Sequence, residues 1–374
     1  MKPFDVYPLF DINPIYAKDV WIYDAQGNQY LDLYGGHAVI SIGHNHPEFL
    51  KALKHQLDQL MFYSNSVINN LQTDYADALG DISNLPDYQL FLCNSGAEAI
   101  ENALKIASFH TNKKRVLSFK NGFHGRTSAA IAVSDYDSMA SPLNRQHLVT
   151  KVALEDYKSL EKAFKSNDIA AVIIEPIQGV GGLDQVSAPF FKFIEFQCRL
   201  NHSCLIVDEI QSGSGRTGKY FAFQHHEVKP DLITMAKGIG NGYPLAGVLI
   251  DKDFESKHGL LGTTFGGNHL ANKAGISVIE ILKKQRLMQK IPALEHHFRD
   301  CASNVSSVIK VKGKGLMLGL EFDLEISKIR KKLLYDFKIF TGGSANKRLL
   351  RILPPLTIKK QHIDKLFNAL ERIT

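Results

Sequence analysis

The middle of the chain alternates short apolar runs with stretches of helical periodicity, and this alternation restricts the fold more than any other feature. Near-continuous apolar strands separated by helices are typical of a mostly parallel sheet covered by helices. The expected strands are residues 89–93, 115–119, 147–152, 170–175, 203–208, 232–236 and 245–250. The expected helices between them are residues 95–110, 157–165 and 189–201. The sequence therefore predicts an α/β unit with a seven-stranded sheet.

After about Gly262 the pattern changes to that of a smaller α+β unit. Its expected helices and strands are residues 268–284, 292–303, 308–311, 316–322, 349–353 and 360–372. The first 45 residues are expected to join this unit. We therefore predict a large domain of residues 46–261 and a small domain made of residues 1–45 and 262–374, with boundaries good to a few residues.

The composition is that of a soluble globular protein, with 44% hydrophobic and 22% charged residues. The 44 Lys and Arg residues exceed the 38 Asp and Glu residues by 6, but no basic block predicts a nucleic-acid surface. No apolar run reaches the roughly 18 residues of a membrane helix, and the chain does not start like a signal peptide. Four scattered cysteines without a CxxC pair favour a reducing cytoplasm.

Lys237 follows the apolar run of residues 232–236 and precedes the glycine-rich segment 238–242. A lysine at the end of a buried strand is partly desolvated, which lowers its pKa and makes the amine a nucleophile toward an aldehyde. Taken alone, Lys237 favours the plainer interpretation that its ammonium group reaches solvent at a strand end.

Asp208 ends another apolar run, residues 204–207. Open α/β sheets bind ligands at the carboxyl ends of their strands, so we expect Asp208 and Lys237 to point into one cleft. Pyridoxal phosphate requires such a carboxylate beside its pyridine nitrogen, because the protonated ring is the electron sink of the reaction. The pair therefore indicates a pyridoxal-phosphate site.

A phosphate group needs backbone N–H donors and a helix N-terminus. Ser95 and Glu98 form an S-x-x-E capping box at the start of a predicted helix, and Gly96 and Ala97 lie between them. Thr263 and Thr264 open a second turn rich in hydroxyl groups and glycine, just before another predicted helix. We predict phosphate contacts from both segments.

The segment 122–127 places an aromatic side chain and an arginine between glycines. Phe123 can stack on a planar ring, and Arg126 can hold a carboxylate through two parallel hydrogen bonds. We interpret His124 as a hydrogen-bonding neighbour of the cofactor rather than as a catalytic base.

Taken together, these segments resemble the class III (ornithine-type) aminotransferases, and most closely their acetylornithine branch. The resemblance runs nearly end to end, from residues 30–36 and 43–47 to residues 350–356. It implies the fold type I of pyridoxal-phosphate-dependent transferases, which is aspartate-aminotransferase-like, and a homodimer with active sites at the interface. It also implies that Lys237 is the Schiff-base lysine and moves the proton between substrate and cofactor.

The resemblance implies further roles at the matching positions. Asp208 is similar to the partner of the pyridinium nitrogen, and Gln211 to the residue that bonds the ring hydroxyl. Gly96 and Ala97, next to Ser95, resemble the phosphate-binding backbone, and Phe123 the ring-stacking residue. The residues expected to contact substrate or the neighbouring subunit are Arg126 for the α-carboxylate of an ornithine derivative, Arg351 for that of glutamate, Thr263 beside the substrate, and Thr264 for the phosphate of the neighbouring subunit.

The chain departs from this pattern at Val180, in the loop of residues 178–182. Related enzymes commonly carry a glutamate there, which pairs with the second arginine and moves aside when glutamate binds. Valine cannot form that pair, which puts the switch between the two half-reactions in doubt.

Two other patterns favour structural roles. Residues 213–218 match G-x-G-x-x-G, but an aromatic segment follows them, and Asp231 precedes its strand instead of ending it, unlike the dinucleotide fingerprint. His44 and His46 lack a carboxylate or cysteine pattern that would complete a metal site, so no metal is expected.

The expected reaction transfers the terminal amino group of an N-acylated ornithine to 2-oxoglutarate, giving the semialdehyde and glutamate, as a step of arginine biosynthesis. No sequence motif identifies the residues that would bind the acyl group. Succinylornithine, acyl-lysine and diaminopimelate-type compounds are therefore alternative substrates, and so are free ornithine and GABA. An aminomutase or racemase on the same fold, and an inactive homologue, are the alternatives outside the transaminases.

Overall fold

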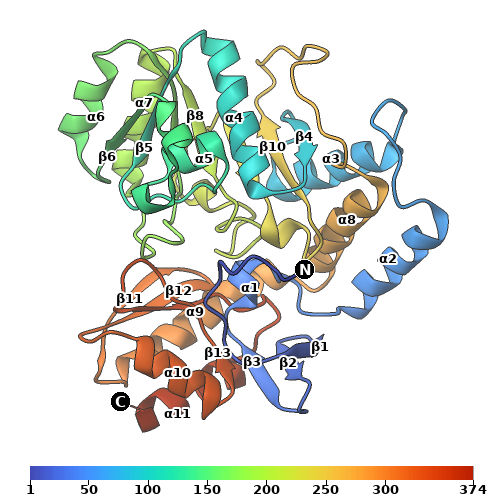
Figure 1. Ribbon diagram of the computed structural model, residues 1–374, viewed down its shortest axis with the longest axis vertical. Helices are drawn as coiled ribbons and strands as arrows, with labels where there is room; N and C mark the ends of the chain where they lie inside the picture. The colour runs from blue at the N-terminus through green and yellow to red at the C-terminus, as the bar shows by residue number, and fades with distance from the viewer. Residues whose placement is uncertain (374) are drawn as a thin grey trace.

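The computed structural model describes residues 1–373, which form an upper region around a large sheet and a lower region around two smaller sheets (Figure 1). The large sheet has the strand order β4-β10-β9-β8-β7-β5-β6. Its strands are β4 (Gln89–Cys93), β5 (Arg115–Phe119), β6 (Val149–Val152), β7 (Ile169–Ile174), β8 (Cys204–Asp208), β9 (Leu232–Met235) and β10 (Ala246–Ile250). All seven predicted strands are present within two residues of the expected ends, so the seven-stranded sheet is confirmed.

The sheet is parallel except at β10, which runs antiparallel to both β4 and β9. The connection between β9 and β10 explains this exception. It spans only residues 236–245 and contains no crossover helix, whereas two parallel neighbours need a connection of about a dozen residues or more. A short connection makes the next strand run antiparallel, and it keeps Lys237 close to the carboxyl end of β9.

Helices cover both faces of the sheet, which is why its central strands are almost entirely apolar. On β8, Cys204 and Ile206 share one core cluster with α4 (Gly96–Thr111), while Leu205 and Val207 share the other with α7 (Ala188–Leu200). The other helices of this region are α2 (Pro47–Gln59), α3 (Asn70–Ser83), α5 (Ser128–Val133), α6 (Tyr157–Phe164) and α8 (His269–Lys284).

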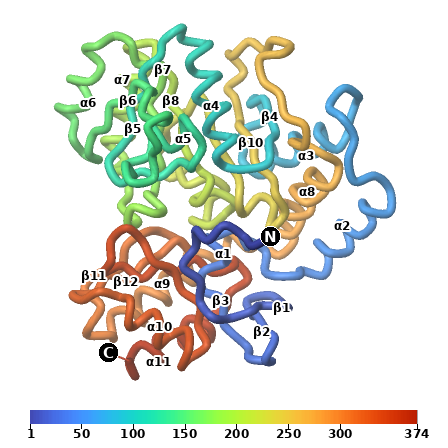
Figure 2. Tube along the Cα trace, in the orientation of Figure 1, coloured from blue at the N-terminus to red at the C-terminus, as the bar shows by residue number. Residues whose placement is uncertain are grey.

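The lower region joins the two ends of the chain (Figure 2). Strand β3 (Gln29–Asp32) pairs in parallel with β13 (Ile339–Phe340), and it extends a sheet that begins with β1 (Pro14–Lys18) and β2 (Trp21–Asp24). A second sheet has the order β11-β12-β14. The other elements of this region are α1 (Gly35–Ala38), α9 (Leu287–Ser303), β11 (Val308–Lys314), β12 (Met317–Phe322), α10 (Ser327–Tyr335), β14 (Leu349–Ile352) and α11 (Lys360–Ile373).

Helix α9 differs most from its expected bounds. The sequence predicts a start at Pro292, but the helix begins at Leu287 and carries Pro292 inside it. Leu287 and Ile291 are fully buried in the core, and this burial holds the first turn in helical form ahead of the proline. The proposed domain boundaries stay a prediction. None of the helices within residues 1–373 combines the length and the apolar character that crossing a bilayer requires.

Candidate active site

Lys237 and Asp208 line the same cavity of about 180 Å³, at the carboxyl ends of β8 and β9. Asp208 is the last residue of β8, and Lys237 is the second residue after the end of β9. The other lining residues are Gly96, Ala97, Phe123, His124, Gly125, Glu175, Val180, Ile210 and Gln211. The cavity therefore lies where parallel α/β sheets generally bind their ligands.

Lys237 is half-buried, and the backbone at this residue is left-handed with φ 51°. A non-glycine residue in this conformation carries strain that its surroundings must maintain. Those surroundings come from the N-terminal segment, because Ser41 Oγ donates to the carbonyl of Gly238 at 2.7 Å, and the Asn241 side chain accepts from the amide of Ser41 at 2.9 Å. Burial lowers the pKa of Lys237, although the charges of Asp208 and Glu175 partly oppose this, so the amine is easier to deprotonate.

Three donors hold the Asp208 carboxylate. His124 Nδ1 lies 2.7 Å from one oxygen, while the amide of Ile210 and the hydroxyl of Thr234 approach the other at 3.0 and 3.3 Å. Burial alone would lower the pKa of His124, but its bond to Asp208 and the charges of Asp208 and Glu175 outweigh burial and raise it. His124 thus holds the Asp208 carboxylate in place.

Glu175 is a lining residue to which sequence reasoning gave no role. It follows β7 by one residue, and its two oxygens accept from the amides of Phe123 and Gly179, each at 2.9 Å. Burial raises its pKa to about 7. Glu175 could have been identified from the same sequence signal as Asp208, because it too is a carboxylate at the carboxyl end of an apolar strand.

The start of α4 forms one wall of the cavity. Ser95 is the N-cap, and its hydroxyl accepts from the amide of Glu98 at 3.3 Å, whereas the Glu98 carboxylate accepts from the amide of Asn94 instead of completing the capping box at Ser95. A Cβ on Gly96 would lie 2.9 Å from Ile210 Cδ1, so glycine keeps this wall open. Anions bind at such a helix start because its first N–H groups are free.

Phe123 forms a second wall, with Tyr136 packed edge-on against it at 5.6 Å. The buried hydroxyl of Tyr136 has no hydrogen-bond partner among the described residues. The cavity thus combines a lysine, a fixed carboxylate, a helix N-terminus and an aromatic wall. These residues fit pyridoxal phosphate, which needs an amine partner, a ring-nitrogen partner and a phosphate cradle.

Arg351 lies beside this cavity, although it does not line it. Its guanidinium is buried and bonds only neutral oxygens, namely the carbonyls of Gly179 and Gly343, the Gln211 side chain and the Tyr34 hydroxyl. Burial lowers the pKa of Arg351. No carboxylate among the described residues forms an ion pair with it, and Val180 contributes only an apolar side chain to the adjacent loop. The arginine is thus positioned to receive a carboxylate from a ligand.

The remaining expected substrate residues lie outside the cavity of this chain. Arg126 is exposed. Burial lowers the pKa of His37 to about 4, and the nearby positive charges, that of Arg126 being the weakest of them, add to this effect. Thr263 is half-buried, with its hydroxyl 3.3 Å from the Asn94 side chain. Thr264 is exposed on the same loop. The fold of one chain does not bring these three residues to the cofactor cavity.

The G-x-G-x-x-G segment has a structural role. Arg216 is fully buried and donates to the carbonyls of Leu316 and Pro354 at 3.0 and 2.8 Å, which joins the loop after β8 to the lower region. Its pKa falls to about 10 because it is buried. His44 likewise forms a hydrogen bond with Asp32, with its Nε2 atom 2.8 Å from the carboxylate.

Comparisons with known proteins agree with this geometry. The chain matches the family profile described as aminotransferase class-III over residues 6–374. It is 36% identical over 383 residues to the acetylornithine aminotransferase of Bacillus subtilis, with 99% of this chain and 96% of that protein covered. It is 35% identical over 366 residues to the putative [LysW]-aminoadipate semialdehyde/glutamate semialdehyde transaminase of Pyrococcus horikoshii, covering 96% of this chain and 95% of that protein.

A solved structure of the ornithine aminotransferase from Toxoplasma gondii, with partial occupancy of pyridoxal phosphate at its active site, superposes with a TM-score of 0.90. It shares 28% sequence identity, and the match covers 99% of this chain and 91% of that one. From the family profile, the relatives and the cavity together, the chain belongs to the class-III aminotransferases, which are pyridoxal-phosphate-dependent enzymes.

Proposed function

We propose that this enzyme transfers the terminal amino group of an N-acylated ornithine, acetylornithine above all, to 2-oxoglutarate. The products are the semialdehyde and glutamate, and the step belongs to arginine biosynthesis in the cytoplasm. The names of several relatives support this proposal. The observation that carries it is Arg351, a buried guanidinium without a carboxylate partner, because glutamate and 2-oxoglutarate each bring such a carboxylate to the site.

In this proposal Lys237 holds the cofactor and then moves one proton between the substrate carbon and the cofactor. Its burial supports this role, because a neutral amine can accept a proton where an ammonium group cannot. Asp208 holds the proton of the ring nitrogen, and Gln211 bonds the ring hydroxyl. Pyridoxal phosphate supplies the electron sink that stabilises a carbanion at the substrate.

The other residues bind and orient. The amides of Gly96 and Ala97 hold the phosphate with the Ser95-capped helix start, Phe123 stacks on the ring, and His124 orients Asp208. Arg126 receives the α-carboxylate of the ornithine derivative. Thr263 contacts the substrate beside it.

We also propose a homodimer that completes each site with Thr264 of the other subunit. Apolar side chains around the Thr264 loop support this proposal, because such a surface is normally covered by a partner. Phe62 packs against Phe265 with ring centroids 5.3 Å apart, and Asn65 bonds the carbonyl of Gly266 at 3.0 Å. The exposed apolar residues of this surface are Leu57, Leu60, Met61, Tyr63, Val67, Ile68 and Phe265.

The test is a comparison of amino donors with the purified holoenzyme. Acetylornithine with 2-oxoglutarate is expected to give the highest kcat/KM, and Lys237→Ala is expected to abolish turnover and the visible cofactor band. A preference for succinylornithine would change the acyl group only. A preference for free ornithine or GABA would overturn the biosynthetic proposal, and amino-group movement without 2-oxoglutarate would indicate an aminomutase or racemase.

An acylated lysine is the second candidate substrate. The relative in Pyrococcus horikoshii, whose printed name includes an aminoadipate semialdehyde, favours it. Such a donor is one methylene longer than an ornithine derivative. Adding an acetyl-lysine donor to the same panel separates the two candidates, because a pocket that fits one chain length generally disfavours the other by about 10- to 200-fold.

A further inference from the structure

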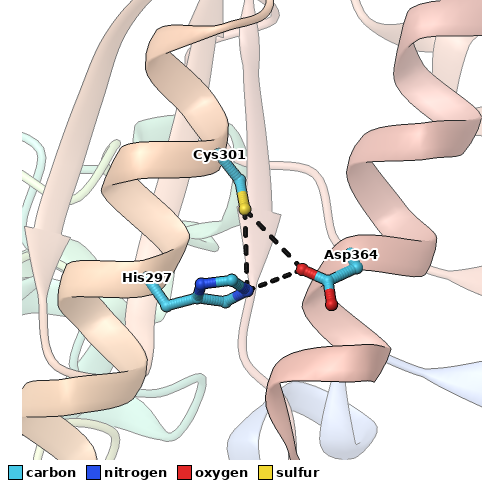
Figure 3. A group of neighbouring side chains, drawn as sticks. All are labelled: His297, Cys301 and Asp364. Carbon is cyan, nitrogen blue, oxygen red and sulfur yellow. Dashed lines mark hydrogen bonds and ion pairs between the residues drawn. The ribbon is translucent and has the colours of Figure 1, made fainter.

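Three side chains of different chemistry meet between α9 and α11, on the lower region of the molecule (Figure 3). His297 and Cys301 lie one turn apart on the same face of α9, and Asp364 faces them from α11. Their nitrogen, sulfur and oxygen atoms lie within 4.8 Å of one another. We propose that His297, Cys301 and Asp364 bind a zinc ion that links α9 to α11.

The three atoms converge on one point. Nε2 of His297 lies 2.6 Å from Asp364 Oδ1 and 3.7 Å from Cys301 Sγ, and Sγ lies 3.8 Å from Oδ1. Around a tetrahedral zinc ion, atoms of these types lie about 3.3–3.6 Å apart. Both sulfur distances are close to that range, and the carboxylate needs to withdraw from the imidazole by roughly 0.7 Å.

The convergence excludes a nucleophilic Cys–His–Asp relay. In such a relay the cysteine and the carboxylate bond opposite nitrogens of the imidazole, so that one orients the ring while the other loses its proton. Here both approach Nε2. Ligand atoms that surround a common ion converge in this way, with the thiol and the carboxylate both close to the same imidazole nitrogen.

The ligand set and its surroundings favour a divalent cation. Imidazole, thiolate and carboxylate together suit zinc, and the two anionic ligands neutralise its charge. Asp300 and Glu371 add negative charge near the thiol. The side chains of His297 and Asp364 are 24% and 47% exposed, so an ion can enter from solvent, and a water molecule can take the fourth position.

The scaffold is rigid enough to keep these positions. Phe298 and Phe367, next to the cluster on the same two helices, pack edge to face with centroids 5.0 Å apart in the core. An ion at this site would connect the last helix of the chain to α9. This inference concerns a site separate from the cofactor cavity and does not depend on the proposed transaminase reaction.

The test uses the holoenzyme, stripped of metal with a chelator and dialysed against buffered zinc. We expect wild type to retain one zinc ion per chain more than Cys301→Ser and Asp364→Asn. His296→Gln is the matched control, because His296 lies on the same helix but pairs with Asp300 on the exposed surface, and it should bind zinc like wild type. Zinc should also raise the melting temperature of wild type and His296→Gln, but not of the two site variants.

Equal zinc contents in wild type and both site variants would overturn the proposal, and the cluster would then be an interhelical ion pair beside a thiol. In that case Asp364→Asn should lower the melting temperature by the same amount with and without zinc. Cobalt gives an independent readout, since a thiolate–cobalt absorption band is expected in wild type and absent in Cys301→Ser. None of these measurements uses turnover, so failure here leaves the proposed reaction untouched.

Discussion

At the residue scale, the chemistry depends on a carboxylate that the protein surrounds with donors. Asp208 accepts from His124, Ile210 and Thr234, and all of these contacts are at least partly buried. The carboxylate is therefore held in one orientation within the cavity, away from bulk water. Substitutions that keep its shape and remove its charge isolate the electrostatic contribution.

Asp208→Asn is expected to lower kcat by roughly 10- to 150-fold, the equivalent of about 1.5–3 kcal/mol for a hydrogen bond to a charged group. The amide retains the volume but cannot hold the proton of the ring nitrogen. Steady-state kinetics with saturating cofactor measures this loss. Thr234→Val is the control, because it removes only the 3.3 Å bond and should cost much less. Equal losses in both variants would argue against a role for the charge.

Val180 leaves Arg351 without an acidic neighbour in the adjacent loop. Val180→Glu is expected to introduce a carboxylate that competes with the substrate carboxylate for this arginine. We expect kcat/KM for glutamate to fall about tenfold, or 1.4 kcal/mol, with a smaller effect on the acylornithine half-reaction. Val180→Gln controls for size without charge. If the two variants behave alike, Arg351 does not recognise the carboxylate of glutamate.

At the element scale, the N-terminus of α4 combines a helix start with a glycine that allows close approach. Gly96→Ala would place a methyl group 2.9 Å from Ile210 Cδ1 and narrow this wall. Overpacking of this kind costs about 1–3 kcal/mol, so the dissociation constant for pyridoxal phosphate should rise roughly 5- to 150-fold. Spectroscopic titration of the cofactor-free protein measures it. Ile210→Val in the same chain should restore part of the affinity, and no recovery would mean that the clash is not the cause.

The loop after β8 contains a buried acid that makes stability depend on pH. Glu209 accepts from Ser212 Oγ at 2.6 Å and from the amide of Phe223 at 2.7 Å, and burial raises its pKa from 4.5 to about 7. Below pH 4.5 the group is protonated in both folded and unfolded chains. As pH rises from 4.5 to about 7, the unfolded chain releases its proton first, so the free energy of unfolding falls across this window.

Glu209→Gln resembles the protonated acid at every pH, and it should therefore gain stability relative to wild type as pH rises. The melting temperature of the variant minus that of wild type is expected to be higher at pH 8 than at pH 5. Glu280→Gln, on the exposed face of α8, should show no such trend. A difference that stays constant between pH 5 and pH 8 would contradict the raised pKa.

At the scale of the whole molecule, the cavity of one chain lacks Thr264, and the surface around its loop is apolar. Ile68→Asp with Phe265→Asp is expected to shift the protein from dimer to monomer and to reduce turnover strongly, because buried charges disfavour association. Light scattering coupled to size exclusion measures the mass. Leu143→Asp, which changes an exposed apolar residue on another surface, is the control. A monomeric wild type with full activity would disprove the dimer proposal.

Local sequence patterns determine much of the fold. The seven strands of the large sheet are recognisable because burial on both faces favours mostly apolar runs, and this is a property of short segments. The helix start at Ser95, the strand end at Asp208 and the position of Lys237 just after β9 are local in the same sense. These segments are expected to lie close together in space because parallel α/β sheets bind ligands at the carboxyl ends of their strands.

Contacts between distant segments were decided only by the tertiary structure. The pairing of β3 with β13, the bonds from Arg351 to Gly179 and Tyr34, and the cluster of His297, Cys301 and Asp364 join residues far apart in the chain. Nothing in a short segment encodes such a meeting, because it depends on how whole elements pack. The sequence by itself therefore determined the helices and strands, and the strand ends where the functional side chains lie. Packing decided which polar groups come into contact, because the way whole elements are buried against one another sets the distances between their side chains.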